Sequence, residues 1–230
     1  MTLWISILLI GLLPVIGWIC YRQLPQWGRI KFYLFMIAWY WLLTGYLFAA
    51  HSQKQVLQTT PVSLPLMLKW MVWTVIVVWA LWELLPILMS LVSPRYREMV
   101  AANLDITDSM PVTAAERSMF LLVAVTVGFC EELISRGMLP ALLQDGGLPY
   151  WLGFVVAGLH FAVGHFLQGW RGIANAALLA LMFTMLYVMT GSLVIPILLH
   201  ALYDYRLVLI SKLQQNKPQA ESLEQVTKGT

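Results

Sequence analysis

Long hydrophobic runs alternate with short polar stretches along most of the chain. A membrane-spanning helix needs about 20 apolar residues, and seven segments of the 230-residue chain approach or exceed that length. They are residues 2–20, 32–50, 66–92, 118–139, 149–167, 173–190 and 192–211. The pattern therefore predicts an all-α fold, a polytopic transmembrane helix bundle of about seven spans.

Polar segments divide this pattern into three parts. We expect N-terminal membrane helices and a polar connection over residues 1–109, a second group of helices over 110–211, and a disordered polar tail over 212–230. The second group begins near Thr113 and Glu116, whose spacing is that of a capping box at a helix N-terminus.

Composition and charge narrow the class of protein. Hydrophobic residues make up 60% and charged residues only 11% of the chain, against about 25% charged in a soluble domain. We therefore expect an integral membrane protein surrounded by lipid. The net charge of +3 is too small to suggest a nucleic-acid partner. Cys20 and Cys130 both fall in apolar segments, which argues against a disulfide framework.

The Lys and Arg residues also predict an orientation, because cytoplasmic loops carry an excess of basic residues. The first, third and fifth loops and the C-terminal segment are basic, whereas the second loop has only Lys54 and the fourth and sixth have no Lys or Arg. This alternation places the N-terminus outside and the C-terminus inside.

One apolar segment contains three charged residues within two turns of helix: Glu131, Glu132 and Arg136. Each charge at the centre of a membrane helix costs roughly 2.5–3.5 kcal/mol, so such groups usually face a protein interior or a wet cavity. Glu132 and Arg136 are four residues apart and can pair within the helix. Glu131 lies about 100° around the axis, so it remains available for chemistry.

Two further polar clusters interrupt apolar helices, and they contain three histidines. His160 and His165 are five residues apart, so they cannot both face one site squarely. His200 and Asp204 are four apart and share a helix face. Together with Glu131, these groups could activate a water molecule against a carbonyl, or bind a divalent metal. The spacing excludes the HExxH arrangement of helical zinc peptidases.

These motifs resemble, in their order, those of the CPBP family, which comprises the CAAX proteases and bacteriocin-processing enzymes and is also called Abi. The similar elements are Glu131-Glu132-x-x-x-Arg136, Phe161-x-x-x-His165 and His200-x-x-x-Asp204. The similarity covers residues 110–210 and implies that 110–211 is a catalytic core. It also implies an intramembrane endopeptidase that hydrolyses a peptide bond in a membrane-associated protein or peptide.

The resemblance also implies roles for individual residues. Glu131 would be the general base and His165 would help to hold the water, with Glu132 and Arg136 supporting the site. His200 and Asp204 would stabilise the oxyanion or help to hold water or metal.

The role of the last position is open. The family often has Asn where this chain has Asp204, and an ionised carboxylate cannot donate to an oxyanion. Asp204 is therefore protonated, orients His200, or ligates a metal. His160 lies outside the motif and is assigned to packing or indirect support of the site.

A metal remains an alternative to metal-free water activation. Zinc would accept Glu131, His165 and His200 as ligands, but these lie on three helices without a local ligand pair. We therefore favour no tightly bound metal.

Two rival functions share this scaffold: a non-catalytic binding or immunity protein, and an ion-binding or transport protein. A residue count along the spans also places Glu131 nearer the outer leaflet and His165 nearer the inner end of its helix, unless a helix is shifted or broken. The enzyme hypothesis requires both side chains to reach one cavity.

Overall fold

The computed structural model describes residues 2–51, 59–93, 95–96 and 108–215, and every regular element in them is helical. The first elements are α1 (Thr2–Gly11), α2 (Leu13–Ala50) and α3 (Leu66–Val92). The next are α5 (Ala114–Glu132), the π-helix η1 (Leu133–Met138), α6 (Leu139–Asp145) and α7 (Tyr150–Gly164). The chain continues through the 3₁₀ turn η2 (Phe166–Gln168), α8 (Gly169–Thr190) and α9 (Val194–Gln215). The all-α prediction is confirmed.

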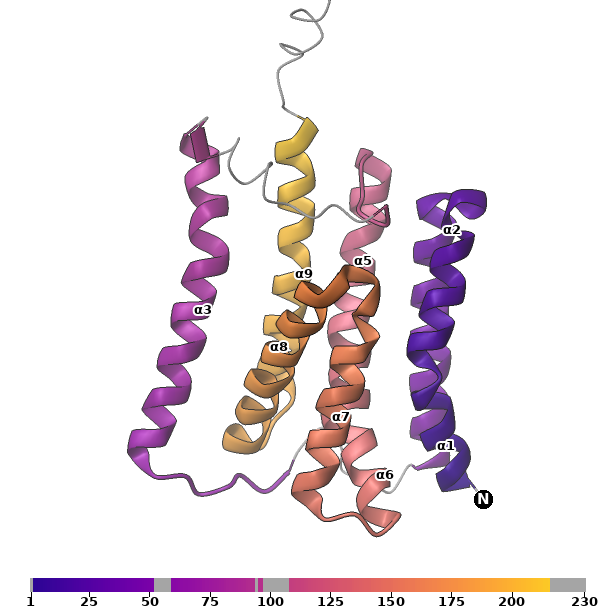
Figure 1. Ribbon diagram of the computed structural model, residues 1–230, viewed down its shortest axis with the longest axis vertical. Helices are drawn as coiled ribbons and strands as arrows, with labels where there is room; N and C mark the ends of the chain where they lie inside the picture. The colour runs from indigo at the N-terminus through magenta and orange to yellow at the C-terminus, as the bar shows by residue number, and fades with distance from the viewer. Residues whose placement is uncertain (1, 52–58, 94, 97–107, 216–230) are drawn as a thin grey trace, which may run out of the picture.

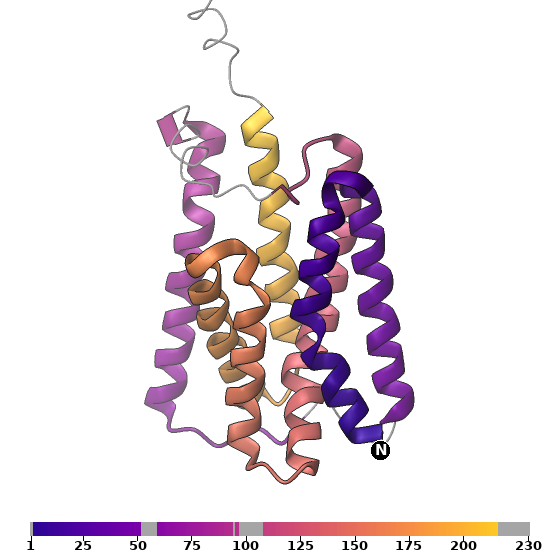
Figure 2. The same ribbon diagram turned by 45° about the vertical axis from the view of Figure 1, so that its right-hand side comes forward.

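The helices run side by side as a membrane bundle (Figure 1). Five described segments are long and apolar enough to cross a membrane: α2, α3, the continuous segment Ala114–Asp145, Phe166–Thr190 and Val194–Lys212. Two shorter apolar helices, α1 and α7, accompany them. Helix α2 contains residues 13–20 of the first predicted span and all of the second, 32–50, and its backbone leaves the helical region between them at Gly28, where φ is 73°. Figure 2 shows its two arms lying side by side and joined at one end.

The predicted start of the second helix group is confirmed. Thr113 caps α5, with its hydroxyl accepting from the Glu116 backbone N–H at 3.2 Å while the Glu116 carboxylate accepts from the Thr113 N–H at 2.9 Å. At the other end of the chain, α9 continues to Gln215. Residues 216–230 lie outside the described residues, and the disordered tail stays a prediction.

Helices α5 and α9 pack against each other most closely at Gly128. A Cβ at this position would lie 2.8 Å from the backbone nitrogen of Ala201 and 3.0 Å from its Cα. Small residues allow such close approach between membrane helices. Because Gly128 lies one turn before Glu131 and Glu132, and Ala201 follows His200, this contact brings two of the predicted motifs together.

Helix α7 is short, and this explains how His165 can lie at the same depth in the bundle as Glu131. It ends at Gly164, and the chain turns into α8 through Gly169, where φ is 71°. In Figures 1 and 2 this turn lies partway along the bundle, well below the upper ends of α5 and α9. His165, the residue after α7, is therefore within the bundle and not at one of its ends.

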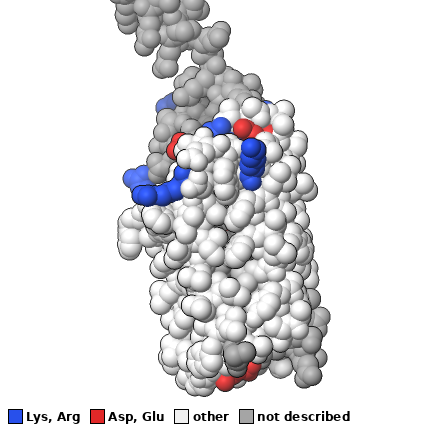
Figure 3. Space-filling view, turned by 90° about the vertical axis from the view of Figure 1, so that its right-hand side faces the viewer, with Lys and Arg blue, Asp and Glu red and all other residues white. Residues whose placement is uncertain are grey.

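The charged side chains are distributed unequally between the two ends. On the face shown in Figure 3, Lys and Arg gather at the upper end, and only Asp or Glu mark the lower end. The upper end contains the turn of α2 and the C-terminal end of α9 (Figure 1). This arrangement agrees with the prediction that the C-terminal end faces the cytoplasm, which itself stays a prediction.

Candidate active site

A buried charge network joins the first and third motifs. The Glu132 carboxylate oxygen Oε1 accepts from the Arg136 guanidinium at 2.9 Å and from the His200 Nδ1–H at 2.7 Å. Glu132 and Arg136 are fully buried, and His200 is 3% exposed. The predicted pair of Glu132 and Arg136 is therefore present, and it also holds the histidine of α9.

Two phenylalanines enclose this network. The Arg136 guanidinium lies over the Phe161 ring, 4.5 Å from its centroid, and 5.7 Å from that of Phe183. The His200 ring packs against the same two rings at centroid distances of 5.8 and 5.6 Å. Cation–π contacts of this kind are strongest where water is excluded, so the Phe of the second motif helps to stabilise the charges of the first.

The backbone at this point is unusual. Leu133 to Met138 form a π-helix that is buried throughout and contains Arg136. Single π-turns inside α-helices are rare and occur frequently at functional sites. The apolar periodicity of the segment contains no signal for this change in helix type.

Glu131 has a different environment from its neighbour. Its side chain is 16% exposed, and its Oε1 accepts a hydrogen bond from the Tyr40 hydroxyl of α2. Its Oε2 lies 3.9 Å from His200 Nε2 and makes no hydrogen bond within the described part of the chain. One oxygen of Glu131 is therefore held and the other is free to bind a small molecule.

His165 is held at the end of α7 by its own helix. Its Nδ1–H donates to the Phe161 carbonyl oxygen at 2.9 Å, and its ring packs on the Phe161 ring at 4.8 Å. A hydrogen bond of this kind sets the tautomer and leaves Nε2 as an acceptor. His165 can thus accept a proton or a hydrogen bond from water.

Glu132, not Asp204, makes the hydrogen bond that orients His200. Asp204 Oδ2 lies 3.8 Å from His200 Nε2, beyond hydrogen-bonding distance, although the two side chains share a helix face as expected. Nε2 of His200 lies between the carboxylates of Glu131 and Asp204, 3.9 Å from the first and 3.8 Å from the second. His200 also lines the cavity described next.

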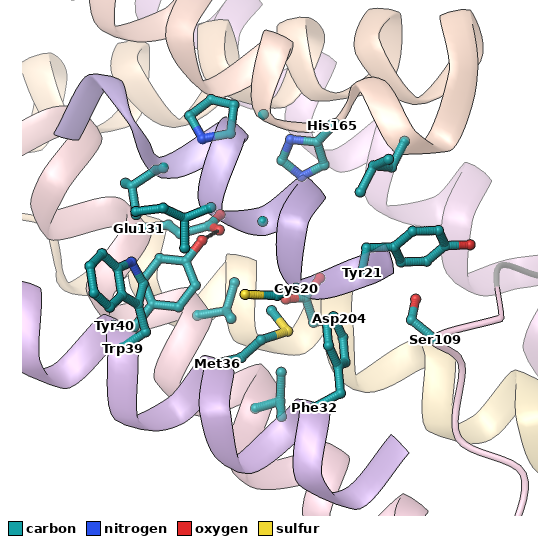
Figure 4. A pocket seen from close by; sticks show the side chains of 18 of the residues that line it. Cys20, Tyr21, Phe32, Met36, Trp39, Tyr40, Ser109, Glu131, His165 and Asp204 are labelled. Carbon is teal, nitrogen blue, oxygen red and sulfur yellow. Dashed lines mark hydrogen bonds between the residues drawn. The ribbon is translucent and has the colours of Figure 1, made fainter. Parts of the chain in front are cut away.

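The predicted side chains of the three motifs meet at one cavity of about 290 Å³. Glu131, His165, His200 and Asp204 line it, and Figure 4 shows Glu131, His165 and Asp204 beside it. Much of the remaining wall comes from α2, including Met36, Trp39 and Tyr40, which Figure 4 labels. The cavity is thus assembled from both predicted parts of the chain.

His160 also lines the cavity, on the α7 side. Both of its ring nitrogens are buried, and neither makes a hydrogen bond within the described residues. Within the described residues no hydrogen bond or ion pair joins it to Glu132, Arg136 or His200, and its assignment to packing or indirect support stays a prediction.

The described side chains do not form a ready metal site. Among residues 2–51, 59–93, 95–96 and 108–215, no group of three or more His, Cys, Asp and Glu has a metal-binding arrangement. Glu131, His165 and His200 line the cavity from separate segments, and Glu131 Oε2 lies 3.9 Å from His200 Nε2. The preference for no tightly bound metal stays a prediction that needs elemental analysis.

The sequence did not indicate two residues that contact the predicted site: Tyr40, which contacts Glu131, and Phe183, which contacts His200. Both lie in apolar, aromatic-rich segments, where a single aromatic residue is ordinarily a packing or interfacial group. Only the folded arrangement brings Tyr40 to Glu131 and Phe183 to His200.

Comparison with known proteins agrees with the three motifs. A family model described as type II CAAX prenyl endopeptidase Rce1-like matches residues 113–206. No curated protein and no solved structure matches the chain. The matched family is one of membrane proteases, which supports a hydrolase at the family level. The predicted resemblance is confirmed: residues 113–206 match the CAAX protease (CPBP) family, over the helices that hold all three motifs.

Proposed function

We propose that the protein is an intramembrane endopeptidase that cleaves a membrane-associated protein or peptide with a water molecule activated by Glu131 and His165. The observation that carries this proposal is the single cavity lined by Glu131, His165, His200 and Asp204, which come from three separate motifs. Such an assembly of a carboxylate, two imidazoles and a free volume suits general acid–base hydrolysis.

The first step is attack by water. The free Oε2 of Glu131 takes a proton from a water molecule while His165 Nε2 accepts a hydrogen bond from it. The water oxygen then forms a bond to the carbonyl carbon of the scissile peptide. Negative charge develops on the carbonyl oxygen of the tetrahedral intermediate.

The second step is collapse of this intermediate. In this scheme His200 is an imidazolium: its Nδ1–H is bound to Glu132, which fixes the ring, and its Nε2–H donates to the oxyanion and stabilises it. Glu131 then gives its proton to the leaving nitrogen, the C–N bond breaks, and a carboxylic acid and an amine are released. The acid then passes its remaining proton to the amine, which leaves a carboxylate and an ammonium group. Each atom and proton is accounted for by Glu131, water and the peptide.

The charged network beside the cavity has a supporting role in this scheme. Glu132 is bound to both Arg136 and His200, so it is not available as a base. The pairing keeps a positive group next to the site and holds His200 at a fixed orientation. Preorganised donors of this kind contribute most when they need no rearrangement during the reaction.

The test compares wild type with Glu131→Gln in proteoliposomes. The probes are two quenched fluorescent peptides of the same sequence ending in a CAAX motif, one farnesylated on its cysteine and one not. Membrane proteins from cells that express either version are compared by mass spectrometry for new termini. We expect wild type to cut a peptide or a cellular membrane protein, and Glu131→Gln to be slower by about 100-fold or more.

The rivals predict other outcomes. A binding or immunity protein would generate no new termini in any of these assays, and its ligand affinity would survive Glu131→Gln. An ion-binding or transport protein would show cation-dependent changes in the reconstituted vesicles without peptide cleavage. Cleavage at equal rates by both proteins would refute Glu131 as the base.

A further inference from the structure

Tyr40 lies outside residues 113–206, yet it makes the only hydrogen bond to Glu131 within the described residues. It belongs to the second arm of α2, and its hydroxyl donates to Glu131 Oε1. Figure 4 shows the Tyr40 ring next to the Glu131 carboxylate at the edge of the cavity. The N-terminal helices therefore contribute directly to the candidate active site.

This hydrogen bond has a geometric consequence. A glutamate carboxylate rotates easily about its last bond, and the Arg136 group that could restrain it is bound to Glu132. Oε1 is occupied by Tyr40, and in this orientation of the carboxylate Oε2 lies 3.9 Å from His200 Nε2. Oε2, the oxygen that must take a proton from water, is thereby held beside His200 at the cavity.

We propose that Tyr40 is a positioning residue for Glu131, which orients the general base for attack by water. The inference rests on the proposed function. It also means that residues 110–211 are not a complete catalytic unit, because one part of the site is supplied by α2. A displaced base costs much of the rate even when the substrate binds normally, since misplacement by about 1 Å can cost about 100-fold.

The adjacent residue Trp41 provides a matched control. Its indole N–H donates to Thr126 Oγ1 at 3.2 Å, so it also forms a hydrogen bond from α2 to α5. Trp41 is 48% exposed and does not line the cavity. Tyr40→Phe and Trp41→Phe therefore each remove one hydrogen bond between the same two helices, but only the first removes a contact to Glu131.

The experiment measures kcat and KM of wild type, Tyr40→Phe and Trp41→Phe in proteoliposomes, with whichever quenched CAAX peptide wild type cleaves. Rates are divided by the amount of folded protein from size-exclusion chromatography, at a temperature below all three melting points. We expect Tyr40→Phe to lower kcat by about 10- to 100-fold and to leave KM within about twofold. Trp41→Phe should keep both constants within about twofold.

The outcomes separate the two proposals. If wild type cleaves neither CAAX peptide and generates no new termini in cellular membrane proteins, the proposed function has failed. If wild type is active and the two variants have equal kcat, Tyr40 serves only in helix packing and the inference is overturned. A higher KM with unchanged kcat for Tyr40→Phe would make it a substrate-binding residue, which also contradicts the positioning role.

Discussion

At the scale of single residues, the two adjacent glutamates have separate environments. Glu132 is fully buried and its Oε1 accepts from both Arg136 and His200. Glu131 faces the cavity and has one oxygen without a hydrogen bond. Of these two adjacent glutamates, Glu132 is thus part of the buried core and Glu131 faces the cavity.

Glu132→Gln should act mainly through stability. The substitution removes the negative charge that pairs with Arg136 and His200, and breaking a buried ion pair costs roughly 3–5 kcal/mol. We expect a clearly lower melting temperature than that of wild type in detergent, and a thermal denaturation assay measures it. A melting temperature equal to that of wild type would show that the network does not stabilise the fold.

Asp204→Asn should retain activity, whereas Asp204→Ala should lose most of it. Asp204 lies beyond hydrogen-bonding distance of His200 and lines the cavity. An amide N–H can donate to a developing oxyanion, which an ionised carboxylate cannot do. The measurement is kcat for peptide cleavage by both variants. If Asp204→Asn and Asp204→Ala are equally inactive, the charge of Asp204 is essential, and a role in orienting His200 or in binding a metal must be reconsidered.

The predictable part of the site comes from local spacing. The i,i+4 separation of Glu132 and Arg136 was sufficient to predict their pair, and the shared face of His200 and Asp204 is present as expected. The bonds from Glu132 to His200 and from Tyr40 to Glu131 join residues that are far apart in sequence. Tertiary packing determines such contacts, and a single sequence does not contain them.

At the scale of elements, the position of the site depends on the close packing of α5 and α9. Gly128 permits this approach, since a Cβ there would clash with the backbone of Ala201. The short helix α7 adds His165 partway along the bundle (Figure 2). The apolar runs predicted these helices. The periodicity did not predict the π-helix, the non-helical backbone of α2 at Gly28, or the end of α7 at Gly164 in place of residue 167.

Gly128→Ala should separate α5 from α9 and weaken the site. Forcing an extra methyl group into packed contacts costs roughly 1–3 kcal/mol, and the shift moves Glu132 away from His200. Melting temperature and kcat should both fall. Gly45→Ala is the control, because a Cβ at this helical position would have no neighbour within 4 Å. Equal effects of both substitutions would show that the close contact is not required.

At the scale of the whole molecule, the cavity lies between the N-terminal helices and the region that matches the protease family. Its wall includes α2 residues together with groups from α5, α7 and α9. The cavity therefore extends across the boundary that the sequence predicts near residue 109.

The whole protein should contain no stoichiometric zinc after purification without added metal. The expectation follows from the origin of Glu131, His165 and His200 on three separate segments, without a local ligand pair. Elemental analysis beside a peptidase assay is the measurement. About one zinc per chain, lost together with activity on chelation and restored with it, would refute this expectation. Glu131 would then be a metal ligand and not the base.

The most direct test of the account is the cleavage rate of Glu131→Gln per folded molecule. Glutamine keeps the size of the side chain and an oxygen that can accept from Tyr40, so we expect a melting temperature close to that of wild type. The rate should fall by about 100-fold or more, because a general base contributes about 10²–10⁴-fold. Cleavage by Glu131→Gln at the wild-type rate would contradict the central claim. So would a loss of activity that is fully explained by unfolding of the variant.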